Sequence, residues 1–196
     1  MKGRVEFWFE FASTYSYLSA MRICSLAKER SVEVEWRPFL LGPIFAAQGW
    51  TTSPFNLYPA KGRNMWRDME RQCATAGLPL VQPDPFPQIS LLAARVALLA
   101  VEAGAGSAFC RGVFAAEFGE GRNISDPQVI GEVLAQAGLG AELLQMAGAP
   151  ETKLALRDQG DVAARRGLYG APSFVVGEEL FWGDDRLEQA LDWAGT

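Results

Sequence analysis

The chain has 196 residues, of which 18 are basic and 23 acidic, so its net charge is −5. A hydrophobic fraction of 49% predicts a folded globular protein, and the length fits one compact domain. A mildly acidic chain without a run of Lys and Arg gives no indication of nucleic-acid or membrane binding. The absence of histidine excludes Ser-His-Asp and Cys-His catalysis and histidine-dependent zinc sites, and we expect no metal site.

The three cysteines, Cys24, Cys73 and Cys110, are far apart and form no CxxC pair. Scattered single cysteines are typical of small core residues in a reducing compartment. The N-terminus is too charged for a signal peptide, and the longest apolar stretch, residues 91–101, is shorter than the ~20 residues that span a bilayer. We therefore expect a cytoplasmic protein.

The first forty residues predict a βαβ unit. In residues 5–11, aromatic side chains at positions 7, 9 and 11 alternate with Glu6, Trp8 and Glu10, which is typical of a strand. Residues 32–39 also alternate and predict a second strand. Between them, residues 15–30 carry apolar side chains at helical spacing. A strand, a helix and a strand in this order imply a parallel pair with a right-handed crossover.

The middle of the chain is predicted to be helical after an irregular start. Residues 42–60 are rich in Gly, Pro and aromatic residues without a clear period, so we predict a long ordered loop there. The four prolines in residues 78–87 predict an extended connector. Helices are predicted at residues 64–76, 90–104, 107–118, 127–137, 141–147 and 150–167.

The end of the chain returns to strands. Residues 173–176 and 179–181 flank Gly177-Glu178, which predicts a hairpin, and Asp185 and Glu188 have the spacing of a capping box for a last helix. The sequence thus predicts an α/β core from residues 1–41 and 168–196. Residues 42–167 would form a loop plus an inserted helical subdomain.

Three junctions could carry chemistry, and each has an ordinary structural alternative. Ser13 stands between a strand and a helix, where it would cap the helix or help to hold an anion. Pro172 precedes a strand, either as an ordinary trans proline or with a cis Ala171-Pro172 bond that directs the backbone toward a ligand. Residues 184–186 would be a solvated helix start or a clamp for the carboxylate and ammonium groups of a ligand.

The order of elements and these motifs resemble the thioredoxin fold in its DsbA-like branch. Within that branch, the chain resembles the 2-hydroxychromene-2-carboxylate isomerases and the kappa-class glutathione transferases. Residues 9–18 resemble the family's D-F-x-S-P-Y-S-Y-L, so that residues 13–16 stand in the place of a CxxC, and residues 37–42 resemble R-P-x-x-L-G. Further matching segments at residues 59–63, 66–71, 86–87 and 181–187 extend the resemblance over nearly the whole chain.

The chain departs from the family pattern at five positions. These are Glu10 in place of Asp, Thr14 in place of Pro, Trp50 in place of Asn, Asn64 in place of Tyr and Ile89 in place of Asn. Trp50, Asn64 and Ile89 put part of the ligand contacts and of the substrate pocket in question.

The resemblance implies that glutathione supplies the thiol that the CxxC would otherwise provide. It implies a homodimer and a cis–trans isomerisation between 2-hydroxychromene-2-carboxylate and trans-o-hydroxybenzylidenepyruvate, a small aromatic substrate. Ser13 would then stabilise the glutathione thiolate, Ala171 and Pro172 would hold the cysteinyl part, and the γ-glutamyl end would be held by Asp184, Asp185 and Arg186.

Aromatic residues of the predicted loop are candidates for a substrate pocket or for packing between the two parts of the chain. Arg37 could bind the substrate carboxylate or have no specific role. The candidate pocket residues are Tyr15, Arg37, Phe45, Trp50, Phe55, Tyr58 and Asp68. Two alternatives stay open, namely a kappa-like glutathione transferase or peroxidase with a broader range of electrophiles and a non-catalytic thioredoxin-fold binding module.

Overall fold

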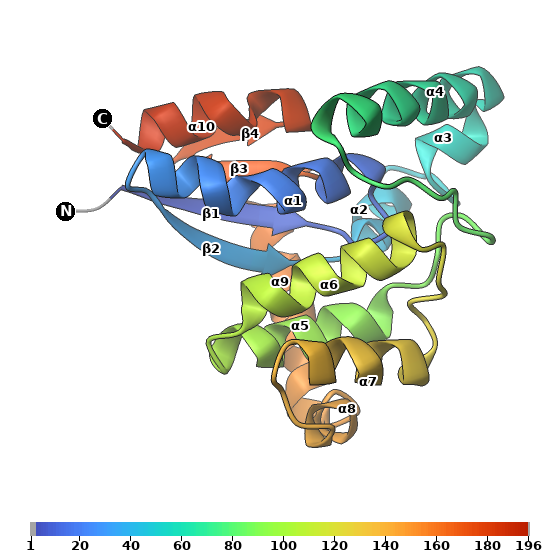
Figure 1. The fold of residues 1–196 in the computed structure, drawn as a ribbon, viewed down its shortest axis with the longest axis vertical. Helices are drawn as coiled ribbons and strands as arrows, with labels where there is room; N and C mark the ends of the chain where they lie inside the picture. Colours follow the sequence, from blue (N-terminus) through green and yellow to red (C-terminus); the bar gives the residue numbers. More distant parts are fainter. Residues whose placement is uncertain (1–2, 196) are drawn as a thin grey trace.

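The four strands form one mixed sheet in the order β2-β1-β3-β4 (Figure 1). The computed structural model describes residues 3–195. In it, β1 (Arg4–Phe9) pairs in parallel with β2 (Glu33–Pro38), while β3 (Ser173–Val176) runs antiparallel to both β1 and β4 (Glu179–Trp182). The predicted βαβ unit and the C-terminal hairpin are therefore confirmed.

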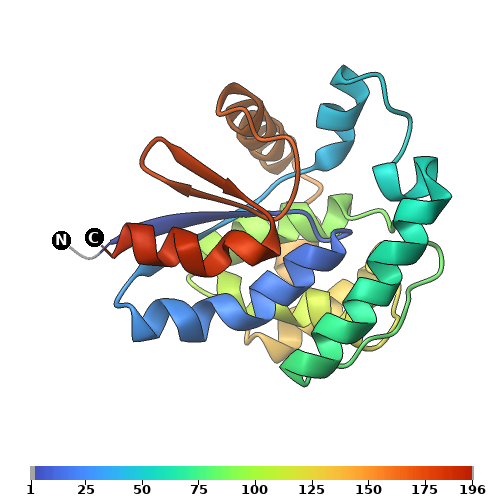
Figure 2. The same cartoon turned by 90° about the horizontal axis from the view of Figure 1, so that it is seen from above.

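Successive side chains of β1 point to opposite faces of the sheet, and both faces are covered. Phe7 and Phe9 belong to the large core that includes residues of α1 (Thr14–Glu29) and α10 (Leu187–Ala194). Trp8 belongs to a smaller core that includes residues of α9 (Pro150–Arg165). Figure 2 shows α1 and α10 on one side of the sheet and α9 on the other.

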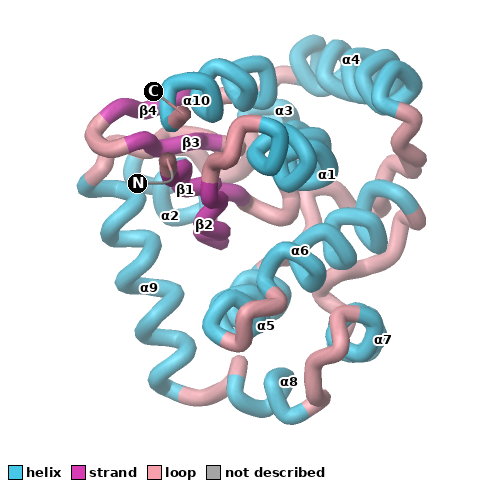
Figure 3. The backbone as a smooth tube through the Cα atoms, turned by 60° about the vertical axis from the view of Figure 1, so that its left-hand side comes forward, coloured by secondary structure: helices cyan, strands magenta, loops and turns pink. Residues whose placement is uncertain are grey.

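The inserted helices stack beside the β2 edge of the sheet (Figure 3). They are α5 (Leu91–Glu102), α6 (Gly106–Phe114), a π-helical turn at Ala115–Gly119, α7 (Pro127–Gln136) and α8 (Glu142–Met146). Phe9 of β1 and Phe114 of α6 lie with ring centroids 5.8 Å apart, so sheet and insert share one core. None of the described helices is long and apolar enough to cross a membrane.

The prediction of an irregular loop over residues 42–60 is wrong. This stretch contains α2 (Leu41–Ala47) and α3 (Pro54–Leu57), and α4 (Pro59–Ala76) begins five residues before the predicted helix. Ser53 caps α3 by accepting a hydrogen bond from the Phe55 amide at 3.3 Å, a local start that the Ser-Pro pair could have indicated. No side chain caps α2 locally; instead the Leu41 amide donates to Glu10, 31 residues away.

The predicted capping box of the last helix is also wrong. Residues Asp184–Arg186 form a short 3-10 turn, and Arg186 occupies the N-cap of α10 without a side-chain hydrogen bond to the helix. The Asp184 carboxylate instead accepts hydrogen bonds from Ser19 and Arg22 of α1. Asp185, the predicted cap, is exposed and lies 3.5 Å from Arg186.

Candidate functional site

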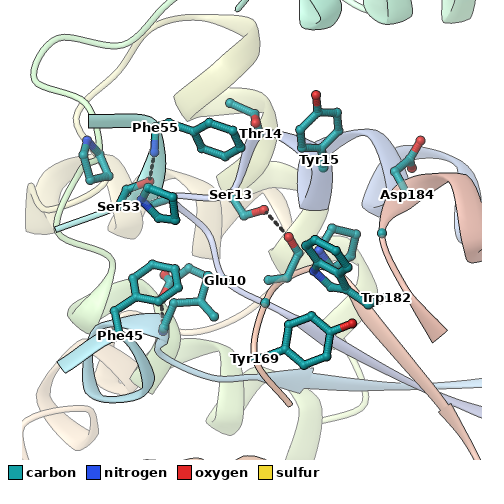
Figure 4. Close-up of a pocket in the computed structure, with 18 of the residues that line it drawn as sticks. Glu10, Ser13, Thr14, Tyr15, Phe45, Ser53, Phe55, Tyr169, Trp182 and Asp184 are labelled. Carbon is teal, nitrogen blue, oxygen red and sulfur yellow. Dashed lines mark hydrogen bonds between the residues drawn. The ribbon is translucent and has the colours of Figure 1, made fainter. Parts of the chain in front are cut away.

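Ser13 is the N-cap of α1, and its hydroxyl makes two hydrogen bonds. Its backbone is extended, with φ −95° and ψ 114°, as helix capping requires. Its Oγ accepts from the Ser16 amide at 3.2 Å and donates to the Ala171 carbonyl oxygen at 3.0 Å. Figure 4 shows the second bond crossing from the start of α1 to the segment before β3. The predicted junctions at Ser13 and Ala171 therefore meet in space, although 158 residues separate them.

The segment before β3 is closely fitted to β4. The Ala171-Pro172 bond is cis, which is the second of the two alternatives that the sequence left open. The Pro172 carbonyl accepts a hydrogen bond from the Gly183 amide at 3.0 Å. A Cβ atom on Gly170 would lie only 2.3 Å from Nε1 of Trp182, so a side chain at this position would displace the Trp182 ring. Trp182 and Tyr169 are about half exposed, and their ring centroids lie 5.0 Å apart.

A cavity of about 2180 Å³ opens beside Ser13. It has two walls of different character, which we call the polar wall and the apolar wall. The polar wall consists of Arg22, Asp184, Asp185, Arg186, Glu188 and Gln189. The apolar wall consists of Leu41, Phe45, Trp50, Phe55, Phe86 and Ile89. Ser13, Thr14, Tyr15 and the segment 169–172 also line the cavity.

Ion pairs organise the polar wall. Asp184 accepts from Arg22 through both carboxylate oxygens at 2.8 Å and from the Ser19 hydroxyl at 2.7 Å, and its side chain is only 10% exposed. The neighbouring Asp185 is 72% exposed and lies 3.5 Å from Arg186, which is itself 53% exposed. The two aspartates therefore differ: Asp184 holds Arg22 in place, whereas Asp185 is accessible to a ligand.

Tyr15 closes the cavity toward α4. Its hydroxyl donates to Asp68 at 3.0 Å, and Asp68 also accepts from Arg71 at 3.1 Å. Burial and the hydrogen bond to the Asp68 carboxylate raise the pKa of Tyr15 far above its ordinary value. Tyr15 thus stays protonated at neutral pH and acts as a neutral hydrogen-bonding group.

The apolar wall is built from aromatic side chains on α2, on α3 and on the connector before α5. The rings of Phe45 and Trp50 lie 5.5 Å apart, and Phe86 packs edge-on against Trp66 at 4.8 Å. Ile89 is 71% exposed, which is high for a large apolar side chain. This wall therefore offers an apolar surface that is accessible to a flat ligand.

The buried carboxyl group of Glu10 lies between Ser13 and the apolar wall. Oε2 accepts from the Leu41 amide at 3.0 Å, and Oε1 accepts from the Ser90 hydroxyl. Burial raises the pKa of Glu10, while these hydrogen bonds act in the opposite direction. A second buried carboxyl group, Glu117, belongs to the π-helical turn, and its pKa is raised well above the ordinary value by burial and by the charge of Glu10.

The structure brings most of the predicted site residues to the cavity and leaves two outside it. Arg37 and Tyr58 are not among the residues that line the cavity. Arg37 pairs with Glu35 and lies 5.8 Å over the ring of Trp8. Tyr58 is half exposed and lies beneath the Lys61 ammonium at 4.8 Å.

Sequence reasoning missed several residues that line the cavity. These are Glu10, Lys61, Phe86, Tyr169 and Trp182, whereas Ile89, which also lines the cavity, had been noted as a departure from the family pattern. Tyr169 and Trp182 directly adjoin the predicted segments 171–172 and 184–186, so proximity in the chain could have indicated them. Lys61 lies on the first turn of α4, between the predicted loop at residues 42–60 and the predicted helix at residues 64–76. It belongs to the segment 59–63 that resembles the family, although no role was predicted for it there.

No cysteine lines the cavity among the residues the structure describes. Cys73 and Cys110 are buried and Cys24 is partly buried, and all three are free thiols. Burial raises the pKa of each, to about 11 for Cys73. These thiols are therefore protonated at neutral pH, and the nucleophile of any thiol chemistry at Ser13 would have to come from a ligand.

Comparison with known proteins agrees with the resemblance in the motifs. The family model of the DSBA-like thioredoxin domain matches residues 4–193. A 2-hydroxychromene-2-carboxylate isomerase of Sphingobium xenophagum is 29% identical over 190 residues, covering 96% of each chain. Human glutathione S-transferase kappa 1 is 26% identical over 199 residues, covering 94% of this chain and 87% of that protein.

Solved structures show the same fold at lower identity. The structure of a 2-hydroxychromene-2-carboxylate isomerase superposes with a TM-score of 0.86 at 23% identity, covering 98% of this chain and 94% of that one. The cytosolic disulfide reductase DsbM of Pseudomonas aeruginosa, solved with GSH, superposes with a TM-score of 0.67 at 20% identity, covering 97% and 95%. The predicted DsbA-like thioredoxin fold is confirmed.

Proposed function

Because the chain belongs to the DSBA-like thioredoxin domain family, we propose that it is a glutathione-dependent isomerase of the 2-hydroxychromene-2-carboxylate isomerase type. The observation that carries the proposal is the Ser13 hydroxyl at the start of α1, 3.0 Å from the Ala171 carbonyl oxygen and on the wall of a large cavity. A hydroxyl donor at a helix N-terminus stabilises an anion, and a thiolate is the anion that a borrowed thiol provides.

The polar wall fits the charged ends of glutathione. Asp185 is the most accessible carboxylate there and would pair with the γ-glutamyl ammonium group. Arg186 is half exposed and would pair with the neighbouring carboxylate. Asp184, which is held by Ser19 and Arg22, would act indirectly by fixing the position of the Arg22 guanidinium group. This assignment separates the roles of the two aspartates, which the motif alone treats together.

The bond between Ser13 and Ala171 supports an exchange of partners on binding. The Ser13 hydroxyl has one hydrogen and can donate it to one acceptor at a time. If it turns to the glutathione sulfur, the Ala171 carbonyl becomes free to accept a hydrogen bond from the cysteinyl amide of the ligand. One movement of the Ser13 side chain would thus serve both the thiolate and the peptide backbone of glutathione.

Bound glutathione would supply a thiolate that adds reversibly to the conjugated double bond of the substrate, so that the bond can rotate. The residues of this chain would favour the ionised thiol. Lowering a thiol pKa from ~8.5 to ~6.5 requires ~2.7 kcal/mol. A charge-assisted hydrogen bond from Ser13 contributes ~1.5–3 kcal/mol and the N-terminus of α1 a further ~0.3–1 kcal/mol, which together are sufficient.

The apolar wall and Lys61 would bind the substrate. Phe45, Trp50 and Phe55 offer faces and edges for an aromatic ring. Lys61 lines the same cavity and would pair with the substrate carboxylate, the role that the sequence offered as one of two alternatives for Arg37. No base is required in this arrangement, which is consistent with a chain that has no histidine.

A kappa-like glutathione transferase is a second candidate, and the size of the cavity favours it. A volume of about 2180 Å³ exceeds the ~300–1,000 Å³ of common small-molecule pockets, so larger electrophiles would fit. Assays with trans-o-hydroxybenzylidenepyruvate and with 1-chloro-2,4-dinitrobenzene distinguish the two. Turnover of the benzylidenepyruvate without conjugation of the chlorodinitrobenzene supports the isomerase. Conjugation of the chlorodinitrobenzene without turnover of the benzylidenepyruvate supports the transferase.

The proposal is tested by titrating the thiolate of bound glutathione against pH through its ultraviolet absorbance. Ser13→Gly should lose ~1.5–3 kcal/mol of thiolate stabilisation, which raises the thiol pKa by about one to two units, while the helix loses only a few tenths of a kcal/mol. Ser53→Gly is the matched control, because it removes the capping hydroxyl of α3 in the same cavity and should leave the titration unchanged.

Two results would contradict the proposal. An unchanged titration curve in Ser13→Gly would reduce Ser13 to a helix cap. A wild-type protein that does not bind glutathione would instead favour the non-catalytic binding module.

A further inference from the structure

Glu10 connects three segments that surround the cavity. Its carboxylate accepts from the Leu41 amide at 3.0 Å and from the Ser90 hydroxyl, and its own carbonyl oxygen accepts from the Ser13 amide at 3.1 Å. The side chain is 7% exposed and lines the cavity. Along the chain, Leu41 lies 31 residues and Ser90 lies 80 residues from Glu10.

Each partner of Glu10 lies at the start of a helix of the site. Ser13 is the N-cap of α1, and Leu41 is the first residue of α2, which carries Phe45. Ser90, which follows Ile89, is the N-cap of α5. Leu41 thus belongs to the part of the apolar wall on α2, and Ser90 adjoins the part on the connector before α5. The Glu10 carboxylate joins both parts to the loop that carries Ser13.

We propose that Glu10 is a positioning residue that sets the distance between Ser13 and the apolar wall and thereby determines which aromatic substrates fit. The statement about substrates rests on the proposed function, whereas the statement about the wall does not. The role of Glu10 depends on a side chain long enough to reach both hydrogen-bond partners. It does not depend on giving or taking a proton.

Side-chain length and ionisation can be separated at this position. In Glu10→Gln, the amide oxygen accepts from the Leu41 amide, and the amide nitrogen donates to the Ser90 hydroxyl, which can also accept. In Glu10→Asp, the carboxylate is shorter by one carbon–carbon bond of about 1.5 Å and cannot span both partners. A positioning role therefore predicts that Gln replaces Glu better than Asp does. An acid–base role predicts the reverse, because only Asp keeps an ionisable group.

The deciding measurement is amide hydrogen exchange of residues 41–50 in the protein without ligand. Glu10→Asp should speed this exchange about tenfold, since one hydrogen bond of ~1–1.5 kcal/mol is lost, while Glu10→Gln should stay within about twofold of wild type. The KM for the aromatic substrate should follow the same order. The affinity for glutathione should change less than about twofold in both variants, because the polar wall is not attached to Glu10.

Glu117→Asp is the matched control. It shortens another buried carboxylate, one whose oxygens have no hydrogen-bond partner within residues 3–195, and it should leave the exchange of residues 41–50 unchanged. Ser90→Ala is a second variant that removes one link and preserves the Leu41 bond. It should speed exchange at the start of α5 and spare residues 41–50.

Two outcomes would overturn the inference. One is an unchanged exchange rate in Glu10→Asp, and the other is a Glu10→Gln protein that exchanges as fast as Glu10→Asp. Because exchange is measured without ligand, a protein that shows the predicted exchange and no isomerase activity would contradict the proposed function and leave the positioning role intact.

Discussion

The side chains on the two walls of the cavity are held in place by different forces, although the backbone of the apolar wall is attached to Glu10 by hydrogen bonds. On the polar wall, Asp184 is fixed by bonds of 2.7–2.8 Å to Ser19 and Arg22, all between elements of the thioredoxin-like core. On the apolar wall, Phe45 and Trp50 pack against each other on and just after a short helix. Hydrogen bonds and ion pairs are directional, whereas apolar packing is not.

This difference indicates how the cavity divides its tasks. A wall of directional bonds suits a ligand that always presents the same charged groups, as glutathione does. A wall of aromatic side chains adapts to rings of different size and selects them by shape. Ser13 lies where the two walls meet, so the sulfur of one ligand and the reacting carbon of the other would be brought together there (Figure 4).

The largest effect is expected from breaking the polar wall at Asp184. Asp184→Ala leaves the partly buried Arg22 and Ser19 without their shared acceptor, so the free energy of unfolding should fall by about 2 kcal/mol. Glutathione affinity should fall by more than tenfold, because Arg22 is no longer held at the wall. Urea denaturation and calorimetric titration measure the two effects.

Asp185→Ala is the matched control for that experiment. Within residues 3–195, the exposed Asp185 makes only a 3.5 Å ion pair with Arg186, so stability should change by less than about 0.5 kcal/mol. Glutathione affinity should nevertheless fall, because the partner of the ammonium group is lost. If affinity is unchanged in Asp185→Ala, our separation of the two aspartates is wrong.

A smaller effect is expected from trimming the apolar wall. Phe45→Ala removes a ring that packs on Trp50, and the KM for the aromatic substrate should rise about tenfold, equivalent to ~1.4 kcal/mol of lost apolar contact. The affinity for glutathione should stay the same. Steady-state kinetics with glutathione saturating measures the change.

Leu57→Ala is the control for Phe45→Ala, because Leu57 is a partly exposed apolar residue of the neighbouring α3 that does not line the cavity. It should leave KM unchanged. A similar rise of KM in both variants would mean that the whole region loosens, and that the individual rings of the apolar wall do not contact the substrate.

The polar wall was the more predictable of the two from sequence. Ser13 lies at a strand-to-helix junction, and residues 184–186 lie at a hairpin-to-helix junction, so local pattern and family motif pointed to the same places. The partners could not be predicted in the same way. That Arg22 binds Asp184 depends on packing α1 against the turn before α10, which joins residues 162 positions apart.

The apolar wall was only partly predictable, because long-range contacts determine its backbone. The start of α2 depends on Glu10 and not on a neighbouring cap, so no periodicity revealed it. Arg37 shows the same limitation for a single side chain. Its position at the end of β2 suggested a ligand, but its contacts are with Glu35, Trp8 and Gln159, and it does not line the cavity.

The smallest effect on chemistry is expected from removing every cysteine. Replacing Cys24, Cys73 and Cys110 together by Ala should leave turnover and the titration of bound glutathione unchanged. Since burial and the charge of Asp184 raise the pKa of Cys73 to about 11, only about one molecule in ten thousand would carry a Cys73 thiolate at pH 7. None of the three thiols lines the cavity among the described residues.

The triple variant does have a cost in stability, which must be separated from the chemistry. Cys73 and Cys110 are fully buried, and each loss of packed sulfur should lower the free energy of unfolding by ~1 kcal/mol, with less at the half-buried Cys24. Turnover is therefore compared at a temperature where urea denaturation shows both proteins fully folded. A folded triple variant without turnover would show that a thiol of the protein is the nucleophile. This result would contradict the proposed role of Ser13 as the hydrogen-bond partner of the glutathione thiolate.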